Sequence, residues 1–114
     1  MSRALVTGGH GFTASWLAAA LLQRGDRVRV LDRPDPRLTD VGTPRGSALA
    51  LHGIENEVEL FEGDLRDAAA LAAAVQGVDT VFHLAAQTIV AGAHSAPRQA
   101  FEVNVLGTWN VLEA

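Results

Sequence analysis

Short apolar runs and amphipathic stretches alternate along the 114 residues, and this alternation predicts strands that take turns with helices. Each expected strand is a run of three or four mainly apolar residues, whereas each expected helix repeats apolar residues at three- and four-residue spacing. The strands are expected at 4–6, 28–31, 58–61 and 81–84, and the helices at 12–23, 68–75 and 98–114. This order predicts an α/β fold of the Rossmann type: a doubly wound parallel sheet, incomplete, with about four strands and flanking helices.

Capping residues support the helix boundaries. Gly25 follows the first helix as a C-cap glycine, Asp67 caps the second, and Pro97 stands in the first turn of the last. Apolar stripes predict the buried faces, which comprise Phe12, Trp16, Leu17, Ala20 and Leu21 in the first helix, and Phe101, Val105, Trp109 and Leu112 in the last. In the last helix the stripe indicates either core or a subunit interface. Residues 35–44 are expected to form a loop, and 48–51 a helix of one or two turns.

A glycine-rich segment joins the first strand to the first helix. Glycine lets the backbone turn sharply and approach a ligand closely, and the N–H groups at a helix start attract phosphate. The spacing is Gly8-x-x-Gly11-x-x-Ala14, with no Gly-Lys-Ser/Thr after it, which excludes a P-loop. The segment therefore predicts a dinucleotide-binding turn, with a tight turn that binds no ligand as the alternative.

An acidic residue follows the second strand at the distance that such a turn requires. Asp32 lies 21 residues after Gly11, and its carboxylate can accept hydrogen bonds from both hydroxyls of an adenosine ribose while repelling a 2′-phosphate. NAD is therefore favoured over NADP. The adjacent Arg33 could meet a 2′-phosphate, so NADP is not excluded. The alternative is an ordinary solvated turn.

The ends of the third and fourth strands supply further candidates. Asp64 can bond the adenine amino group while Leu65 packs against the ring, although a capping aspartate is an equal alternative. Leu84, Ala85 and Ala86 end the fourth strand, where small residues let a cofactor cross the strand tips. His83, just before them, is expected to be a buried, hydrogen-bonded strand residue rather than a base.

Composition removes several classes of function. The chain contains no tyrosine, lysine or cysteine, and all nine basic residues are arginine. Mechanisms that need a phenol acid or base, a lysine Schiff base or a thiolate metal site are therefore excluded. The four histidines show no metal spacing, and a net charge of −4 argues against nucleic acid or an anionic membrane as a partner. Because no apolar run is long enough for a signal or a span, a cytoplasmic protein is expected.

Four motifs occur together and in order, and with them the chain resembles the extended short-chain dehydrogenase/reductase family, the NAD-dependent epimerases and dehydratases of nucleotide sugars. The motifs are Thr7-Gly8-Gly9-x-Gly11-Phe12, Gly63-Asp64-Leu65, His83-Leu84-Ala85-Ala86-Gln87 and Asn104-Val105-x-Gly107-Thr108. Within this family, the chain most resembles the nucleotide-sugar 4,6-dehydratases, because of Trp16-Leu17, Gln87 and a phenylalanine before Asn104. Thr13-Ala14 departs from the family, which usually has an aliphatic residue and glycine there.

The resemblance assigns a role to each candidate residue. It implies that Gly8, Gly11, Phe12 and Thr13 surround the pyrophosphate, and that Asp32 holds the adenosine ribose. It places Asp64 and Leu65 at adenine, and Leu84, Ala85 and Ala86 near the inner ribose and nicotinamide. Asn104 would brace the strand-tip loops, with a helix residue that bonds locally as an equal alternative. Gln87 with the loop through Ser95 would approach the sugar, with a plain surface loop as an equal alternative.

The family's reaction needs a Tyr-x-x-x-Lys pair, and this chain holds neither residue type, so no catalytic residue is predicted. We interpret residues 1–114 as the N-terminal part of a dinucleotide-binding domain, with the substrate domain absent and a nucleotide sugar bound only in the complete protein. The alternative is a free-standing dinucleotide-binding module or sensor. An apolar edge at 81–84 and the uncovered last helix argue against that alternative and predict self-association.

Overall fold

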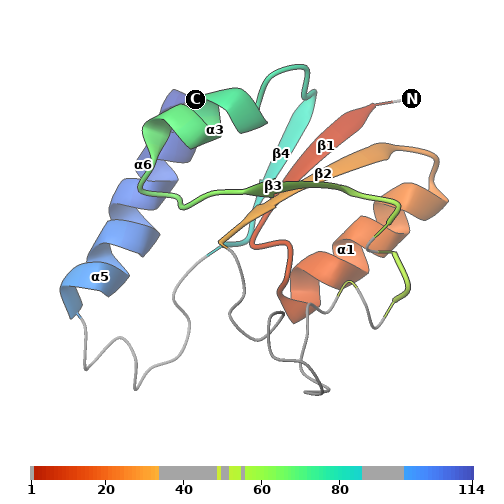
Figure 1. Ribbon diagram of the computed structural model, residues 1–114, viewed down its shortest axis with the longest axis horizontal. Coiled ribbons are helices and arrows are strands. Elements are labelled where there is room, and N and C mark those ends of the chain that lie inside the picture. Colours follow the sequence, from red (N-terminus) through yellow and green to blue (C-terminus); the bar gives the residue numbers. More distant parts are fainter. Residues whose placement is uncertain (1, 34–48, 50–51, 55, 86–96) are drawn as a thin grey trace.

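The computed structural model describes residues 2–33, 49, 52–54, 56–85 and 97–114. Within these residues, four parallel strands form one sheet in the order β3-β2-β1-β4 (Figure 1). The strands are β1 (Arg3–Thr7), β2 (Arg27–Asp32), β3 (Glu59–Glu62) and β4 (Thr80–His83). The predicted fold class, a Rossmann-type parallel sheet, is therefore confirmed.

Helices lie on both faces of the sheet, as right-handed crossovers between parallel strands require (Figure 1). Helix α1 (Phe12–Gln23) packs on one face with a buried cluster that includes Ala4, Val6 and Val30. Helix α3 (Ala68–Ala74) packs on the other face, where the buried cluster includes Leu5 and Leu31. In β1, consecutive residues thus alternate between the two cores, as the period of a strand dictates.

The last helical segment differs from its prediction. It is divided into α5 (Pro97–Phe101), a π-helical turn η2 (Glu102–Leu106) and α6 (Gly107–Glu113), rather than one α-helix. In the wide turn the Asn104 carbonyl accepts a hydrogen bond of 2.6 Å from the Thr108 hydroxyl. A side-chain hydroxyl that binds a helix carbonyl competes with the backbone pattern, which accounts for the local change of helix type.

The predicted buried face of α1 is wrong for its aromatic residues. Phe12 is 70% exposed and Trp16 58% exposed, and Ala20 is exposed as well. The buried residues of α1 are Ala14, Ser15, Ala18 and Leu21, with Leu17 partly buried. Because small side chains let a helix approach a sheet closely, the alanine face and not the aromatic face meets the strands.

The predicted core role of the last apolar stripe is also wrong within this chain. Its members are exposed: Phe101, Val105, Trp109 and Leu112 by 55%, 51%, 61% and 77%. The segment instead buries Val103 and Gly107. A Cβ on Gly107 would lie 2.7 Å from the Leu65 Cβ, so the absence of a side chain brings α6 against the loop after β3. The subunit-interface interpretation stays a prediction.

A buried arginine joins the middle of the sheet to α3. Arg29 in β2 is 6% exposed, and its Nη1 donates to the carbonyls of Ala74 and Gln76 at 2.6 and 2.8 Å. Its Nε donates to Glu59 at 3.0 Å, and its guanidinium lies 4.6 Å from the Phe61 ring centroid. These carbonyls belong to the end of α3, where a cation is favourable, so Arg29 anchors that helix.

The predicted loop at 35–44 and most of the predicted helix at 48–51 lie outside the described residues; Leu49 is described, and it is fully buried. No helix in the described part of the chain is both long and apolar enough to cross a membrane.

Candidate functional site

The carboxyl ends of all four strands meet at one edge of the sheet, because the strands are parallel (Figure 1). Gly8 follows β1, Asp32 ends β2, Asp64 follows β3 and Leu84 follows β4. In open parallel sheets, ligands bind in the crevice outside these ends, where neighbouring connections diverge to opposite faces. Here the connection from β1 leads to α1 on one face, and the strand beside it, β4, leads towards α5 and α6.

The glycine-rich turn has the conformation that its sequence requires. Gly8 has φ +73°, a region that favours glycine, and its N–H donates to the Leu31 carbonyl at 2.8 Å. The Gly11 N–H donates back to the Gly8 carbonyl at 2.9 Å, which closes the turn. Gly11 is also the N-cap of α1 and makes no side-chain capping bond, so no cap competes for the first N–H groups of the helix. Phe12 and Thr13 are exposed beside it.

At Gly8 and Gly9 any side chain would collide with a neighbouring strand or with the backbone just after one. A Cβ on Gly9 would lie 2.4 Å from the Val30 Cβ, and a Cβ on Gly8 would lie 2.9 Å from the Ala85 Cα. The turn therefore lies directly on β2 and against the end of β4. The structure thus brings Gly8 and Ala85, predicted as parts of one site, into contact.

Asp32 is joined to the glycine-rich turn. Its Oδ2 accepts the His10 N–H at 3.0 Å, and its Oδ1 accepts the Arg33 N–H at 2.8 Å. The two N–H groups fix the orientation of this carboxylate at the edge of the sheet. Asp32 could be predicted from the sequence but its bond to the His10 N–H could not, because a backbone N–H leaves no signal in residue types.

Asp64 forms an ion pair beside the same edge. Its Oδ1 accepts from Arg66 Nε at 2.9 Å and its Oδ2 from Arg66 Nη2 at 2.7 Å, while Arg66 Nη1 lies 3.6 Å from Glu102 Oε2. Hydrogen bonds from Arg66, opposed by burial and aided by the charges of Arg66 and Arg33, lower the pKa of Asp64 to about 2. The contact of Asp64 with adenine stays a prediction.

This low pKa predicts a contribution to stability that is lost at acid pH. Because the folded-state pKa of Asp64 lies below the ordinary 3.8, the pair stabilises the fold above about pH 4. The contribution is lost as the pH falls from about 4 to about 2. Urea unfolding of the chain and of Asp64→Asn across this range should converge at low pH. A difference that does not depend on pH would contradict the prediction.

Leu65 and the end of β4 are placed differently from one another. The Leu65 side chain is 6% exposed and packs in the core beside Val103 and Leu71, so little of it faces the edge of the sheet. Leu84 is 40% exposed and Ala85 partly so, and both lie at the strand tip as predicted. Ala86, Gln87 and Ser95 lie outside the described residues.

A group that the sequence analysis missed is the Thr7 hydroxyl. Its Oγ1 accepts the N–H groups of Leu84 and Ala85 at 3.0 and 3.1 Å, and lies 2.8 Å from His83 Nδ1. His83 Nε2 lies 2.9 Å from Thr108 Oγ1. The expectation that His83 is a hydrogen-bonded strand residue is confirmed, whereas the ring is partly and not fully buried. This burial lowers the pKa of His83. The partners of Thr7 are 76 to 78 positions away, so short-range patterns could not reveal them.

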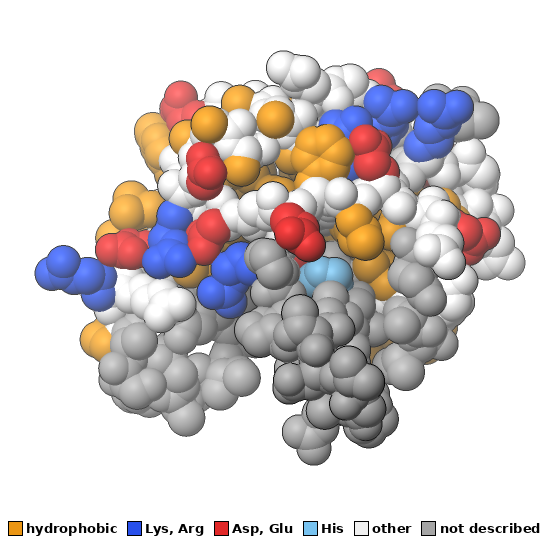
Figure 2. Space-filling view, viewed as in Figure 1, with side chains coloured by type: hydrophobic (Ala, Val, Ile, Leu, Met, Phe, Trp, Pro, Cys, Tyr) orange, Lys and Arg blue, Asp and Glu red, His pale blue; other side chains and the backbone are white. Residues whose placement is uncertain are grey.

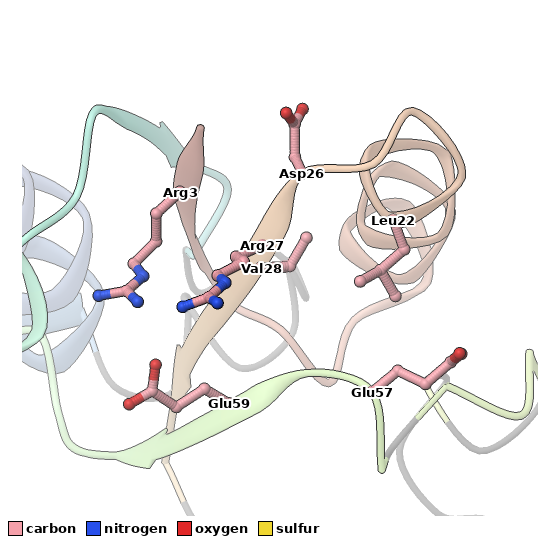
Figure 3. A pocket seen from close by; sticks show the side chains of 7 residues that line it. All are labelled: Arg3, Leu22, Asp26, Arg27, Val28, Glu57 and Glu59. Carbon is pink, nitrogen blue, oxygen red and sulfur yellow. The ribbon is translucent and has the colours of Figure 1, made fainter. Parts of the chain in front are cut away.

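A cavity of about 310 Å³ lies away from this edge. It is lined at the amino ends of the strands by Arg3, Arg27, Val28 and Glu59, together with Leu22, Asp26 and Glu57 (Figure 3). Guanidinium and carboxylate groups share its wall, and Glu59 is already paired with Arg29. On the face shown in Figure 2, acidic and basic side chains likewise lie side by side rather than in a patch of one sign.

The parallel sheet, the glycine-rich turn at the start of α1 and the acid at the end of β2 together define a Rossmann-type domain. The sequence profile of the GDP-mannose 4,6 dehydratase family matches residues 5–114. The chain belongs to this family, and its likeness to the extended short-chain dehydrogenases/reductases is thereby confirmed.

Individual relatives agree with this placement. The chain is 40% identical over 118 residues to a 3 beta-hydroxysteroid dehydrogenase/Delta 5-->4-isomerase of Mycobacterium tuberculosis, covering 100% of this chain and 28% of that protein. It is 37% identical over 114 residues to a dTDP-glucose 4,6-dehydratase of Mycolicibacterium smegmatis, covering 98% of this chain and 32% of the relative.

Among solved structures, the UDP-glucose-4-epimerase of Stenotrophomonas maltophila with bound NAD and formylated UDP-arabinopyranose has a TM-score of 0.80 at 27% identity. The match covers 99% of this chain and 33% of the epimerase. The chain thus spans about a third of the length of these relatives.

Proposed function

We propose that the chain is the NAD-binding, N-terminal part of a nucleotide-sugar 4,6-dehydratase or epimerase, and that it binds the adenosine diphosphate half of the cofactor. The observation that carries the proposal is the bond from the His10 N–H to Asp32 Oδ2, which sets a carboxylate beside a glycine turn and an uncapped helix start. The NAD-bound epimerase of similar fold supports it.

The residues at this edge fit a dinucleotide. Side chains at Gly8 or Gly9 would collide with Ala85 or Val30, so glycine at both positions lets the turn pack closely on the strand ends. The N–H groups at the start of α1, which no side chain caps, would then meet a phosphate. Gly8, Gly11, Phe12 and Thr13 would hold the pyrophosphate, Asp32 the adenosine ribose, and Leu84, Ala85 and Ala86 the inner ribose and nicotinamide. Asp64 would hold the adenine, with only the small exposed part of Leu65 beside it. When bound, the cofactor supplies hydride transfer.

The chain by itself binds the cofactor and does not catalyse, because it contains neither tyrosine nor lysine to move the proton. Turnover of any nucleotide sugar by the purified chain, with contamination excluded, would contradict this. Reading the coding sequence past Ala114 for an open frame with Tyr-x-x-x-Lys separates the proposal from a free-standing dinucleotide-binding module.

A second candidate is the corresponding part of a dehydrogenase that acts on a hydroxysteroid or a similar alcohol. The 40% identity to the hydroxysteroid dehydrogenase favours it. Both candidates use the same edge of the sheet for the cofactor. The two candidates are distinguished by measuring whether the protein encoded by the full open reading frame turns over a nucleotide sugar or a 3β-hydroxysteroid.

Replacing Asp32 tests the cofactor assignment. Asp32→Asn keeps one acceptor oxygen but removes the charge, so NAD should bind about 10- to 100-fold more weakly, as expected for the loss of a charged hydrogen bond. Discrimination against NADP should fall, because the carboxylate no longer repels a 2′-phosphate. Isothermal titration with both dinucleotides measures the two effects.

Asp79→Asn is the matched control, since Asp79 Oδ2 also accepts a backbone N–H, that of Arg3 at 2.9 Å. Asp79 lies before the amino end of β4, whereas Asp32 lies at the carboxyl end of β2. Its affinities should equal those of the unaltered chain. Equal losses in both variants would overturn the assignment of Asp32 to the ribose.

A further inference from the structure

A chain of hydrogen bonds connects β1, β4 and α6. It begins at the N–H groups of Leu84 and Ala85, passes through Thr7 Oγ1 to His83, and continues from His83 Nε2 to Thr108 Oγ1. It ends at the Asn104 carbonyl, which accepts the Thr108 hydroxyl at 2.6 Å in the π-helical turn.

Hydrogen counting assigns the proton on His83. A threonine hydroxyl has two acceptor lone pairs and one hydrogen. Both lone pairs of the fully buried Thr7 Oγ1 are taken by backbone N–H groups, so its hydrogen points to His83 Nδ1, which must be an acceptor. The neutral ring then carries its hydrogen on Nε2 and donates to Thr108 Oγ1, whose own hydrogen goes to Asn104. In this one arrangement each hydrogen-bond donor and acceptor of the Thr7, His83 and Thr108 side chains has a partner.

The arrangement sets a distance at the cofactor edge. The two N–H bonds to Thr7 hold Ala85 so close to Gly8 that a Cβ on Gly8 would lie 2.9 Å from the Ala85 Cα. A protonated His83 would place a hydrogen on Nδ1 and leave the Thr7 hydroxyl hydrogen without an acceptor. Thr7 would then have to give up one of its backbone donors.

We propose that His83 is a positioning residue: its neutral Nε2–H form holds the Leu84–Ala85 turn against Gly8, and dinucleotide affinity therefore depends on Thr108 in α6 and on pH. This rests on the proposed function of the edge as a dinucleotide site. The groups that face the ring are uncharged hydroxyls, Thr7 from β1 and Thr108 from α6. Among the described residues, burial is the cause that lowers the pKa of His83, and no charged group adds to it.

The first test needs no variant. Long-range ¹H–¹⁵N correlation of the histidine rings in the intact chain, at pH 7.5, reports which nitrogen carries hydrogen. We expect His83 as the neutral Nε2–H tautomer, and, as the pH falls below the ordinary histidine range, its protonation together with shifts of the Leu84 and Ala85 amide signals. An Nδ1–H tautomer or an imidazolium at pH 7.5 overturns the proposal.

The second test uses a matched pair in α6. Thr108→Val removes the hydroxyl at nearly constant shape and should weaken NAD binding by about threefold to tenfold, the loss expected for one neutral hydrogen bond. Thr108→Ser keeps the hydroxyl and should bind NAD as tightly as the unaltered chain does. In the unaltered chain, the affinity for NAD should fall as the pH is lowered and His83 becomes protonated. Equal affinity in the valine variant overturns the proposal. If the unaltered chain binds no dinucleotide, the proposed function fails. The measured tautomer of His83 still shows whether the hydrogen bonds from Thr7 to Thr108 are arranged as proposed.

Discussion

Replacing Gly8 by alanine is expected to remove measurable dinucleotide binding and to destabilise the fold by roughly 2–5 kcal/mol. Two causes combine. At φ +73° an alanine pays the cost of a left-handed conformation, and its Cβ would lie 2.9 Å from the Ala85 Cα. Since that atom is backbone, it cannot rotate away, and the ends of β1 and β4 must separate. Isothermal titration with NAD and urea unfolding measure the two effects.

Gly25 provides the control for conformation alone. It also has positive φ, +95°, but a Cβ there would meet nothing within 4 Å. Gly25→Ala should therefore cost only about 1–2 kcal/mol of stability and leave NAD affinity unchanged. If both alanine variants lose binding equally, contact between Gly8 and the end of β4 does not shape the site.

Replacing Arg29 by methionine is the change with the largest expected effect on stability alone. The variant keeps an apolar stem of similar length but leaves the carbonyls of Ala74 and Gln76 without the guanidinium. The Ala74 carbonyl is a buried acceptor, whose loss of a partner costs about 1–3 kcal/mol, and the part-buried bond to Gln76 adds to this, so we expect a loss of roughly 3 kcal/mol. This is a large share of the 5–15 kcal/mol typical of a domain. Urea unfolding at pH 7 measures it.

Arg24→Met is the matched control, because the Arg24 side chain is 69% exposed. Its partner Asp26 is only 9% exposed, but Asp26 also accepts hydrogen bonds from the N–H and the hydroxyl of Ser2. Solvent screens such a pair, so the change should stay within about 0.5 kcal/mol. Equal destabilisation by the two substitutions would show that Arg29 does not anchor α3.

The strands could be predicted because each is a short apolar run bounded by residues that end it. The buried faces of the helices were harder to predict than the strands. Helix α1 carries two periodic stripes, one aromatic and one of small residues, and the sequence does not reveal how closely the helix approaches the sheet. The approach at Gly9 and Val30 selects the alanine face over Phe12 and Trp16. In the π-helical turn the Asn104 carbonyl accepts the Thr108 hydroxyl, a bond that helical periodicity does not encode.

The candidate site divides in the same way. Residues that act through the backbone of one segment, such as Gly8 and Gly11, were visible as spacing, and Asp32 was visible as an acid at a set distance. Thr7 and Thr108 belong to two of the motifs, but their hydrogen-bonding roles could not be predicted, because these roles arise only when β1, β4 and α6 meet. His10 contributes an N–H to Asp32, and its buried Nδ1 has no hydrogen-bond partner among the residues that the structure describes.

The central claim is that the carboxyl edge of this sheet binds NAD, and an ¹H–¹⁵N titration of the intact chain with NAD tests it most directly. We predict saturable shifts confined to the amide signals of the glycine-rich turn, Asp32, Asp64 and the Leu84–Ala85 turn. The amides around the cavity at the amino ends of the strands should not move. No shift at millimolar NAD in the folded chain, or shifts centred on that cavity, would contradict the account.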